Sequence, residues 1–166
     1  MTQEITVRRA KPSDAGRIAA FIKHAYRGRT AFDETSVIER FGGAGFFLAE
    51  KGGELIGMLG WRAENLVVHV MDFLVWPAVE RAAAAQVLFA EMEVAAAGLQ
   101  CEVAMLFPPR PIPSGLIGFC KTLGYEPQNV SELAKAWREA AIEAGMGEDG
   151  VVLMKRLRTD RVVRPM

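Results

Sequence analysis

Two polar residues interrupt an otherwise apolar stretch, Leu66 to Val75, and are the first candidates for chemistry. His69 carries an imidazole, whose ordinary pKa is about 6.5. Asp72 carries a carboxylate, which is costly to bury without a partner. Either side chain could take a proton from an amine, or Asp72 could hold that amine in place. The alternative for each is a structural role, as a hydrogen-bonded histidine or as a carboxylate satisfied by a backbone group or an arginine.

The spacing of these two residues limits how they could act together. They are three positions apart, so a regular strand would point them to opposite faces of a sheet. Only a bulge would bring them to the same face.

The apolar stretch belongs to a βαβ pattern that would position both residues. Residues 66–75 predict a central strand, the Ala-rich residues 79–97 predict a long helix, and residues 102–107 predict the next strand. Such units usually make parallel, right-handed neighbours in a sheet. Gly98 is predicted to cap the helix.

The remaining pattern predicts helices packed on a mixed sheet. Gly52-Gly53 joins two apolar runs, which is typical of a β-hairpin. Asn129 and Glu132 have the spacing of a capping box and predict a helix over 129–144, and Ser114 is predicted to cap a shorter one. The further predicted strands are 5–8, 46–50, 55–61 and 151–157, and the further predicted helices begin at 12–14, 34 and 115.

Composition excludes several classes of protein. With 166 residues, 51% of them hydrophobic and 24% charged, the chain has the balance of one globular domain and not of a disordered protein. Twenty basic and twenty acidic residues cancel, which gives no global argument for binding nucleic acid or an anionic membrane. No apolar run approaches the roughly 20 residues that span a bilayer, and Met1-Thr2-Gln3-Glu4 does not resemble a signal peptide. The two cysteines argue against a disulfide scaffold and a zinc site, so we expect a cytoplasmic protein with reduced thiols and no metal.

Several segments together resemble the GNAT superfamily of acyl-CoA-dependent N-acetyltransferases. The resemblance covers about residues 5–157 and is carried by Val7–Asp14, the hairpin Ala49–Gly57, Phe73–Pro77, Phe119–Tyr125 and Met154–Leu157. It implies an α/β (α+β) three-layer fold, in which helices flank a mixed, mostly antiparallel sheet of about six to seven strands with a splayed parallel pair. We therefore expect a single domain over 1–157 and a polar C-terminal tail over 158–166.

The resemblance also implies a reaction, the transfer of an acetyl group from acetyl-CoA to a primary amine by direct attack. The backbone of Phe73, Leu74 and Val75 is expected to polarise the acetyl carbonyl. Asp72 or His69 is then a candidate base, and Cys120 stands where the family often has the tyrosine that protonates the leaving thiolate. Backbone N–H groups at the start of the long helix are expected to bind the pyrophosphate, and the residues that supply them are Arg81, Ala82, Ala83, Ala84 and Ala85.

Three departures from the family pattern support a different reading. The loop normally reads Arg or Gln, two residues, Gly, one residue, Gly or Ala, but here Glu80 and Ala83 occupy the first and fourth positions. Glu80 puts a negative charge near the phosphates, which Arg81 could offset. Cys120 is much shorter than tyrosine. The alternative is a catalytically impaired GNAT-like domain that serves as a binding or dimerisation module.

The acceptor amine is expected to lie near the first two helices. Tyr26, Arg29 and Phe32 are the candidates for contacting it, with His24 and Arg27 close in sequence, and the alternative is a solvated loop. The predicted helix 129–144 would serve as a lid, or would bury Trp137 in a homodimer. The sequence leaves the acceptor open between an amino acid, an antibiotic, a polyamine and a protein N-terminus.

Overall fold

The computed structural model describes residues 4–41 and 45–158, so the predicted tail over 158–166 lies, except for its first residue, outside the described residues. The strands are β1 (Ile5–Arg9), β2 (Gly45–Lys51), β3 (Glu54–Glu64), β4 (Val67–Val75), β5 (Val103–Leu106), β6 (Glu126–Asn129) and β7 (Val151–Arg156). The helices are α1 (Ala15–Ala25), α2 (Glu34–Phe41), α3 (Arg81–Gly98), α4 (Leu116–Thr122) and α5 (Lys135–Glu143). Single 3-10 turns lie at η1 (Pro12–Asp14), η2 (Ala78–Glu80) and η3 (Val130–Glu132).

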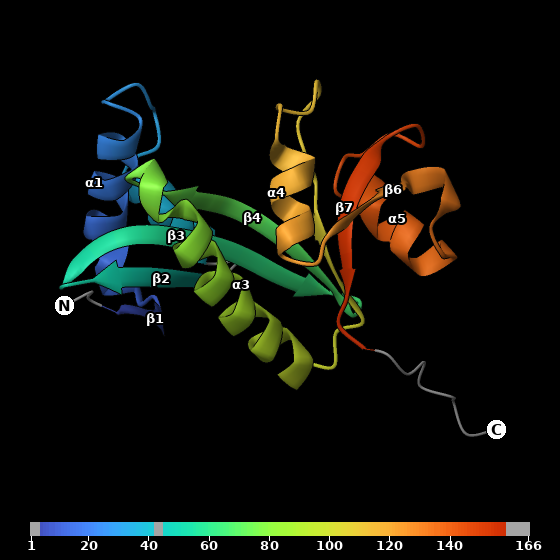
Figure 1. Ribbon diagram of the computed structural model, residues 1–166, viewed down its shortest axis with the longest axis horizontal. Coiled ribbons are helices and arrows are strands. Elements are labelled where there is room, and N and C mark those ends of the chain that lie inside the picture. The colour runs from blue at the N-terminus through green and yellow to red at the C-terminus, as the bar shows by residue number, and fades with distance from the viewer. Residues whose placement is uncertain (1–3, 42–44, 159–166) are drawn as a thin grey trace. The chain divides into compact units, whose positions relative to one another are not determined.

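The strands form a seven-stranded sheet in the order β1-β2-β3-β4-β5-β7-β6 (Figure 1). The sheet is mostly antiparallel, and β4 and β5 form its parallel pair. The predicted mixed α/β fold is therefore confirmed. The chain divides into two compact units, residues 1–62 with 70–92 and residues 63–69 with 93–166, which are described separately below.

The first unit is built on the antiparallel strands β1, β2 and β3. The register runs from Ile5 opposite Lys51 to Arg9 opposite Phe47, and β2 pairs with β3 around the predicted glycine turn. Gly52 and Gly53 both have positive φ, 60° and 80°, a conformation that glycine adopts without steric penalty. The predicted hairpin is confirmed.

Helices α1 and α2 pack on this sheet through apolar side chains at helical spacing. Ile18 and Ile22 of α1 and Val37 of α2 are buried with Leu48 of β2 and Met58 of β3. Helical periodicity puts the first two side chains on one face, which explains why this segment folds as a helix against the sheet.

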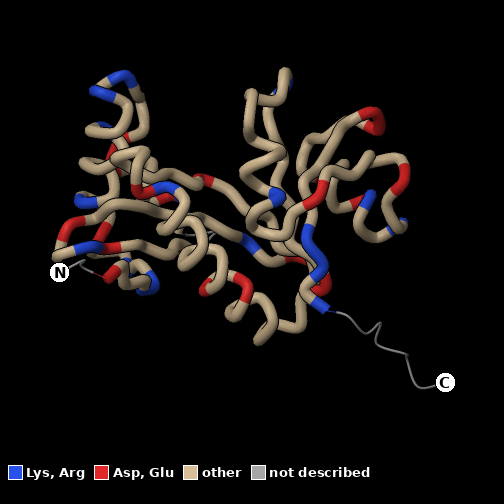
Figure 2. Tube along the Cα trace, viewed as in Figure 1, with Lys and Arg blue, Asp and Glu red and all other residues tan. Residues whose placement is uncertain are grey.

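The first unit carries both acidic and basic residues (Figure 2), and four of them form a network that joins β1, β2 and the start of α1. Arg8 Nη1 and Nη2 donate to the two carboxylate oxygens of Asp14 at 2.9 and 2.8 Å. Arg8 Nε and Arg17 Nη1 each donate to Glu50 at 2.7 Å. Hydrogen bonds from Arg8 lower the pKa of Asp14 to about 2. The network ties the start of α1 to β1 and β2.

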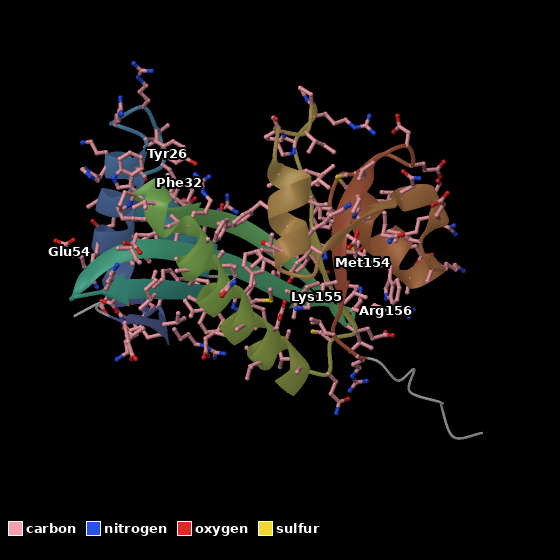
Figure 3. All side chains as sticks on the ribbon, viewed as in Figure 1. Tyr26, Phe32, Glu54, Met154, Lys155 and Arg156 are labelled. Atoms are coloured by element: carbon pink, nitrogen blue, oxygen red, sulfur yellow. The ribbon has the colours of Figure 1, made fainter. Side chains whose placement is uncertain are left out.

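Asp14→Asn is expected to lower the free energy of unfolding by about 1 kcal/mol at pH 7, because it removes a bidentate, partly exposed ion pair. The pKa of Asp14 is lower in the folded chain than in the unfolded one, so its stabilising contribution is present above about pH 4. That contribution is lost as the pH falls towards 2, and the difference between variant and wild type should shrink over that range. Urea unfolding at several pH values measures this, with Glu54→Gln, at an exposed turn position (Figure 3), as the control. A difference that stays constant down to pH 2.5 would contradict the assigned ion pair.

The second unit pairs β7 with β5 on one side and with β6 on the other, both antiparallel. Its core contains Val67, Met105, Leu133, Ala141 and Val152. A polar group lies beside this core: Tyr125 donates to Glu93 at 3.1 Å, and Lys155 donates to the other oxygen of Glu93 at 3.0 Å. Burial, followed by the charge of Glu93, raises the pKa of Tyr125, which therefore stays protonated.

The predicted helix over 129–144 is confirmed only in its C-terminal part, and its predicted start is wrong. Residues 126–129 form β6, one 3-10 turn follows, and α5 begins only at Lys135. Asn129 makes no capping hydrogen bond through its side chain, and Leu133 has an extended backbone, with φ −72° and ψ 152°. Pairing of Asn129 with Val151 uses the chain for a strand instead. Tertiary hydrogen bonding overrides the local capping pattern here.

Two predicted helix caps are also wrong. Helix α3 includes Gly98, and the positive φ comes two residues later, at Gln100 (61°). Gly115, with φ 82°, takes the N-cap position of α4 in place of Ser114. Over the described ranges, no helix is both long enough and apolar enough to cross a membrane.

Candidate active site

A pocket of about 250 Å³ opens in the first unit where α1, the segment after it, α2, β3 and the end of β4 meet. Tyr26 and Phe32, labelled in Figure 3, lie on the segment that links α1 to α2. The charged side chains in the lining are Arg40 of α2 and Asp72 of β4. The remaining lining residues are Ile22, Thr30, Met58, Phe73 and Leu74.

Asp72 breaks the regular geometry of β4. Its φ is 49°, in the left-handed region, where aspartate and asparagine occur more often than other non-glycine residues. Asp72, Phe73 and Leu74 are consecutive, yet all three line the pocket. In a regular strand, successive side chains point to opposite faces. The left-handed residue interrupts this alternation and lets consecutive residues border one cavity. Left-handed residues of this kind cluster at functional sites.

Arg40 and Asp72 form an incomplete ion pair in the pocket. Nη1 of Arg40 lies 3.4 Å from Oδ2 of Asp72, and their side chains are 43% and 25% exposed. Oδ2 is itself buried and accepts no hydrogen bond from the part of the chain that the structure describes. Burial raises the pKa of Asp72, and the charge of Arg40 offsets part of that rise. A carboxylate with a raised pKa is a stronger base than an exposed one.

The start of α3 continues directly from the 3-10 turn η2. The backbone N–H groups of Glu80 and Arg81 donate to the carbonyls of Pro77 and Ala78 within this turn, and the first α-helical residues Arg81, Ala82 and Ala83 are exposed. The positive end of a helix dipole lies there. Ala84 and Ala85, by contrast, are buried against the unit's core.

The negative charge of Glu80 is neutralised by a residue that the sequence did not indicate. Lys51, at the end of β2, donates to Oε1 of Glu80 at 2.8 Å. The expectation that Arg81 offsets this charge is corrected, since Lys51 is the partner in the structure. The ammonium group of Lys51 therefore compensates the charge of Glu80 at this helix start.

No family model matches the sequence, and no curated protein matches it. Solved structures, however, match over nearly the whole chain. The PaiA N-acetyltransferase of Thermoplasma acidophilum, solved with coenzyme A, has a TM-score of 0.67 at 12% identity, covering 92% of this chain and 99% of that one. A GNAT-family acetyltransferase of Staphylococcus aureus Mu50 gives 0.67 at 13%, covering 93% and 100%. The ribosomal-protein-S18-alanine N-acetyltransferase of Escherichia coli gives 0.67 at 12%, covering 98% and 100%.

The fold is that of the GNAT acetyltransferases. The resemblance that the sequence motifs indicated is therefore confirmed for the fold. In the GNAT fold of this chain, the pocket borders β4 at the residues from which the resemblance implied contacts with the acetyl group, Phe73 and Leu74. Val75, the third of these residues, is buried. Its side chain packs closely against Gly57, where an added Cβ would lie 3.3 Å from Cγ2 of Val75.

The structure brings some of the predicted GNAT site residues together. Asp72, Tyr26 and Phe32 line the same pocket. His69 is a buried residue of the second unit, with its ring 5.2 Å from that of Phe107. Cys120 is buried in α4, and burial raises the pKa of its thiol. Catalytic roles for these last two residues stay predictions.

Other pocket residues could not be recognised from sequence. Arg29 is exposed and is absent from the described lining, whereas Arg40, eleven positions later, is part of it. Arg40 occupies the solvent-facing side of an amphipathic helix, where charged residues are ordinary. The available signal was weak: an arginine in the last turn of a helix whose opposite face is apolar.

Proposed function

We propose that the chain is an acetyl-CoA-dependent N-acetyltransferase and that the pocket beside Asp72 receives the acceptor amine. The pocket itself carries this proposal: it joins a base, Asp72, to the segment of β4 from which GNAT proteins are expected to contact the acetyl group. The GNAT fold and the neutralisation of Glu80 by Lys51 at the start of α3 support the donor. The proposed acceptor is a primary amine. The described residues contain no group of three His, Cys, Asp or Glu side chains placed to hold a metal ion.

The proposed mechanism assigns Asp72 the proton of the acceptor ammonium. An amine attacks only in its neutral form. Burial raises the pKa of Asp72, which makes its carboxylate a stronger base for the proton of the ammonium group. Backbone N–H groups of Phe73 and Leu74 are suited to stabilise negative charge on the carbonyl oxygen. Acetyl-CoA, when bound, supplies the thioester: a C–N bond forms, the C–S bond breaks, and the thiol leaves with one proton while another goes to solvent.

Acetyl-CoA at 1 mM is expected to raise the melting temperature. For a Kd of about 10 μM, binding to the native state alone adds about 2.7 kcal/mol, which is several degrees for a chain of this size. Differential scanning fluorimetry with acetyl-CoA, and with free adenosine as the control that lacks the diphosphate, measures this. Thiol release on addition of amines then tests transfer. A folded sample that shows no shift with 1 mM acetyl-CoA would refute the donor assignment.

A further inference from the structure

The charges of the pocket identify the class of acceptor. We propose that the acceptor is a neutral α-amino acid with an apolar side chain, whose ammonium pairs with Asp72 and whose carboxylate pairs with Arg40. This inference rests on the proposed function, because it names the substrate of the same pocket.

Charge balance is the first argument. The charged side chains of the described lining are one arginine and one aspartate, so the pocket has no net charge. A polyamine or an aminoglycoside carries several positive charges and would need several carboxylates to replace its hydration. A neutral α-amino acid carries one charge of each sign, which matches the pocket.

The separation of the two charges is the second argument. Nη1 of Arg40 and Oδ2 of Asp72 are 3.4 Å apart, and Oδ2 accepts no hydrogen bond from the described residues. In an α-amino acid the ammonium nitrogen and the carboxyl carbon are separated by two bonds and lie about 2.5 Å apart. A zwitterion of that size can place its ammonium against the part of the Asp72 carboxylate that lines the pocket while its own carboxylate meets the neighbouring guanidinium.

Arg40 has the donors and the support that this role requires. A guanidinium offers five N–H donors in a planar fork that binds carboxylates through two parallel hydrogen bonds. In the structure its Nη1 also lies 3.9 Å from the sulfur of Met71, and its Cζ lies 5.6 Å from the ring centroid of Phe32. Both contacts are weak. They orient the guanidinium, and its remaining N–H groups stay available to donate to a stronger acceptor.

The apolar part of the lining selects the side chain of the acceptor. Ile22, Phe32, Met58 and Phe73 surround the ion pair. A volume of about 250 Å³ lies below the roughly 300–1,000 Å³ typical of pockets for drug-sized ligands. The pocket therefore suits a small molecule with an apolar side chain, such as leucine or methionine, better than an extended peptide.

The test compares L-leucine with L-leucinamide, which keeps the ammonium but lacks the carboxylate, and with spermidine. Wild type, Arg40→Gln and the control Lys23→Gln are assayed by thiol release from acetyl-CoA at pH 7 to 9. Lys23 is exposed on α1 and lies outside the lining of the pocket that contains Asp72 and Arg40, although it borders a neighbouring hollow. Binding of leucine and leucinamide is measured separately by calorimetry without acetyl-CoA.

We expect wild type to prefer leucine over leucinamide by about 10- to 100-fold in kcat/KM, the scale of charge-assisted hydrogen bonds. In Arg40→Gln that ratio should fall to about 1 through loss of leucine turnover, and Lys23→Gln should keep it.

Equal or better turnover of leucinamide or spermidine by wild type would overturn the amino-acid assignment and leave the acetyltransferase intact. Binding of leucine that depends on Arg40, without thiol release from any amine, would support the amino-acid site and overturn the proposed reaction. Absence of both leucine binding and leucine turnover would overturn the inference.

Discussion

Replacing Asp72 with asparagine is expected to lower turnover by about 10- to 1,000-fold, the usual scale for loss of a general base. Asparagine keeps the size and shape of the side chain and, like aspartate, tolerates the left-handed backbone at φ 49°. It cannot take a proton from an ammonium group. Steady-state kinetics with leucine as a function of pH measures the loss.

The same substitution is expected to leave the fold at least as stable as the wild type at pH 7. The pKa of Asp72 is raised by burial, so the folded chain disfavours its ionised form. A carboxyl group with a higher pKa in the folded state costs stability as the pH rises through that pKa. Asparagine never ionises, so the variant should gain relative to wild type above about pH 4, with part of the gain offset by loss of the Arg40 pair.

A matched variant separates chemistry from backbone strain. Asp72→Ala removes the base as well, but alanine in the left-handed region costs about 1–2 kcal/mol. Both variants should lose activity, and only Asp72→Ala should lose stability in urea unfolding. Turnover close to wild type in Asp72→Asn would show that the base is another residue or solvent.

Ala83→Glu is expected to weaken acetyl-CoA binding by about 10- to 100-fold while making the protein slightly more stable. Ala83 is the third residue of α3 and is exposed, at the positive end of the helix dipole. A glutamate there stabilises a helix by about 0.3–1 kcal/mol. The same charge repels a diphosphate bound to the first turn, by a few kcal/mol at an effective dielectric constant of about 20.

The opposite signs of these two effects make the result specific. Calorimetry with acetyl-CoA gives the affinity, and thermal unfolding without ligand gives the stability. Ala90→Glu adds the same charge at an exposed position farther along α3 and should change neither quantity appreciably. Unchanged affinity in Ala83→Glu would remove the helix start from the donor site.

Local patterns predicted most of the elements of this fold. Helix α2 has the bounds 34–41 that its periodicity predicted, and the hairpin turns at Gly52-Gly53 as expected. These features depend on neighbours in sequence. The predicted helix start at Asn129 was wrong because the capping spacing is a local signal, whereas pairing of β6 with β7 involves residues more than 20 positions away.

The candidate site likewise combines a residue that the sequence indicated with residues that only the structure identified. Asp72 could be singled out because burying a carboxylate within an apolar strand is costly unless the carboxylate has a partner or a functional role. Arg40 could not, since an arginine on an amphipathic helix is ordinary until the helix is placed against the strand. The role of Lys51 likewise depends on its ion pair with Glu80, 29 positions later in the sequence.

The sequence by itself determined most of the strand and helix pattern, the similarity of the fold to GNAT proteins and the identity of one candidate base. It could do so because burial and backbone preference act on adjacent residues and leave periodic traces. Only the tertiary structure decided that Asp72 is left-handed, that Arg40 lies 3.4 Å from it, and that Lys51 neutralises Glu80. Each of these depends on packing between segments far apart in the chain, and electrostatic interactions change steeply over the few ångströms that packing sets.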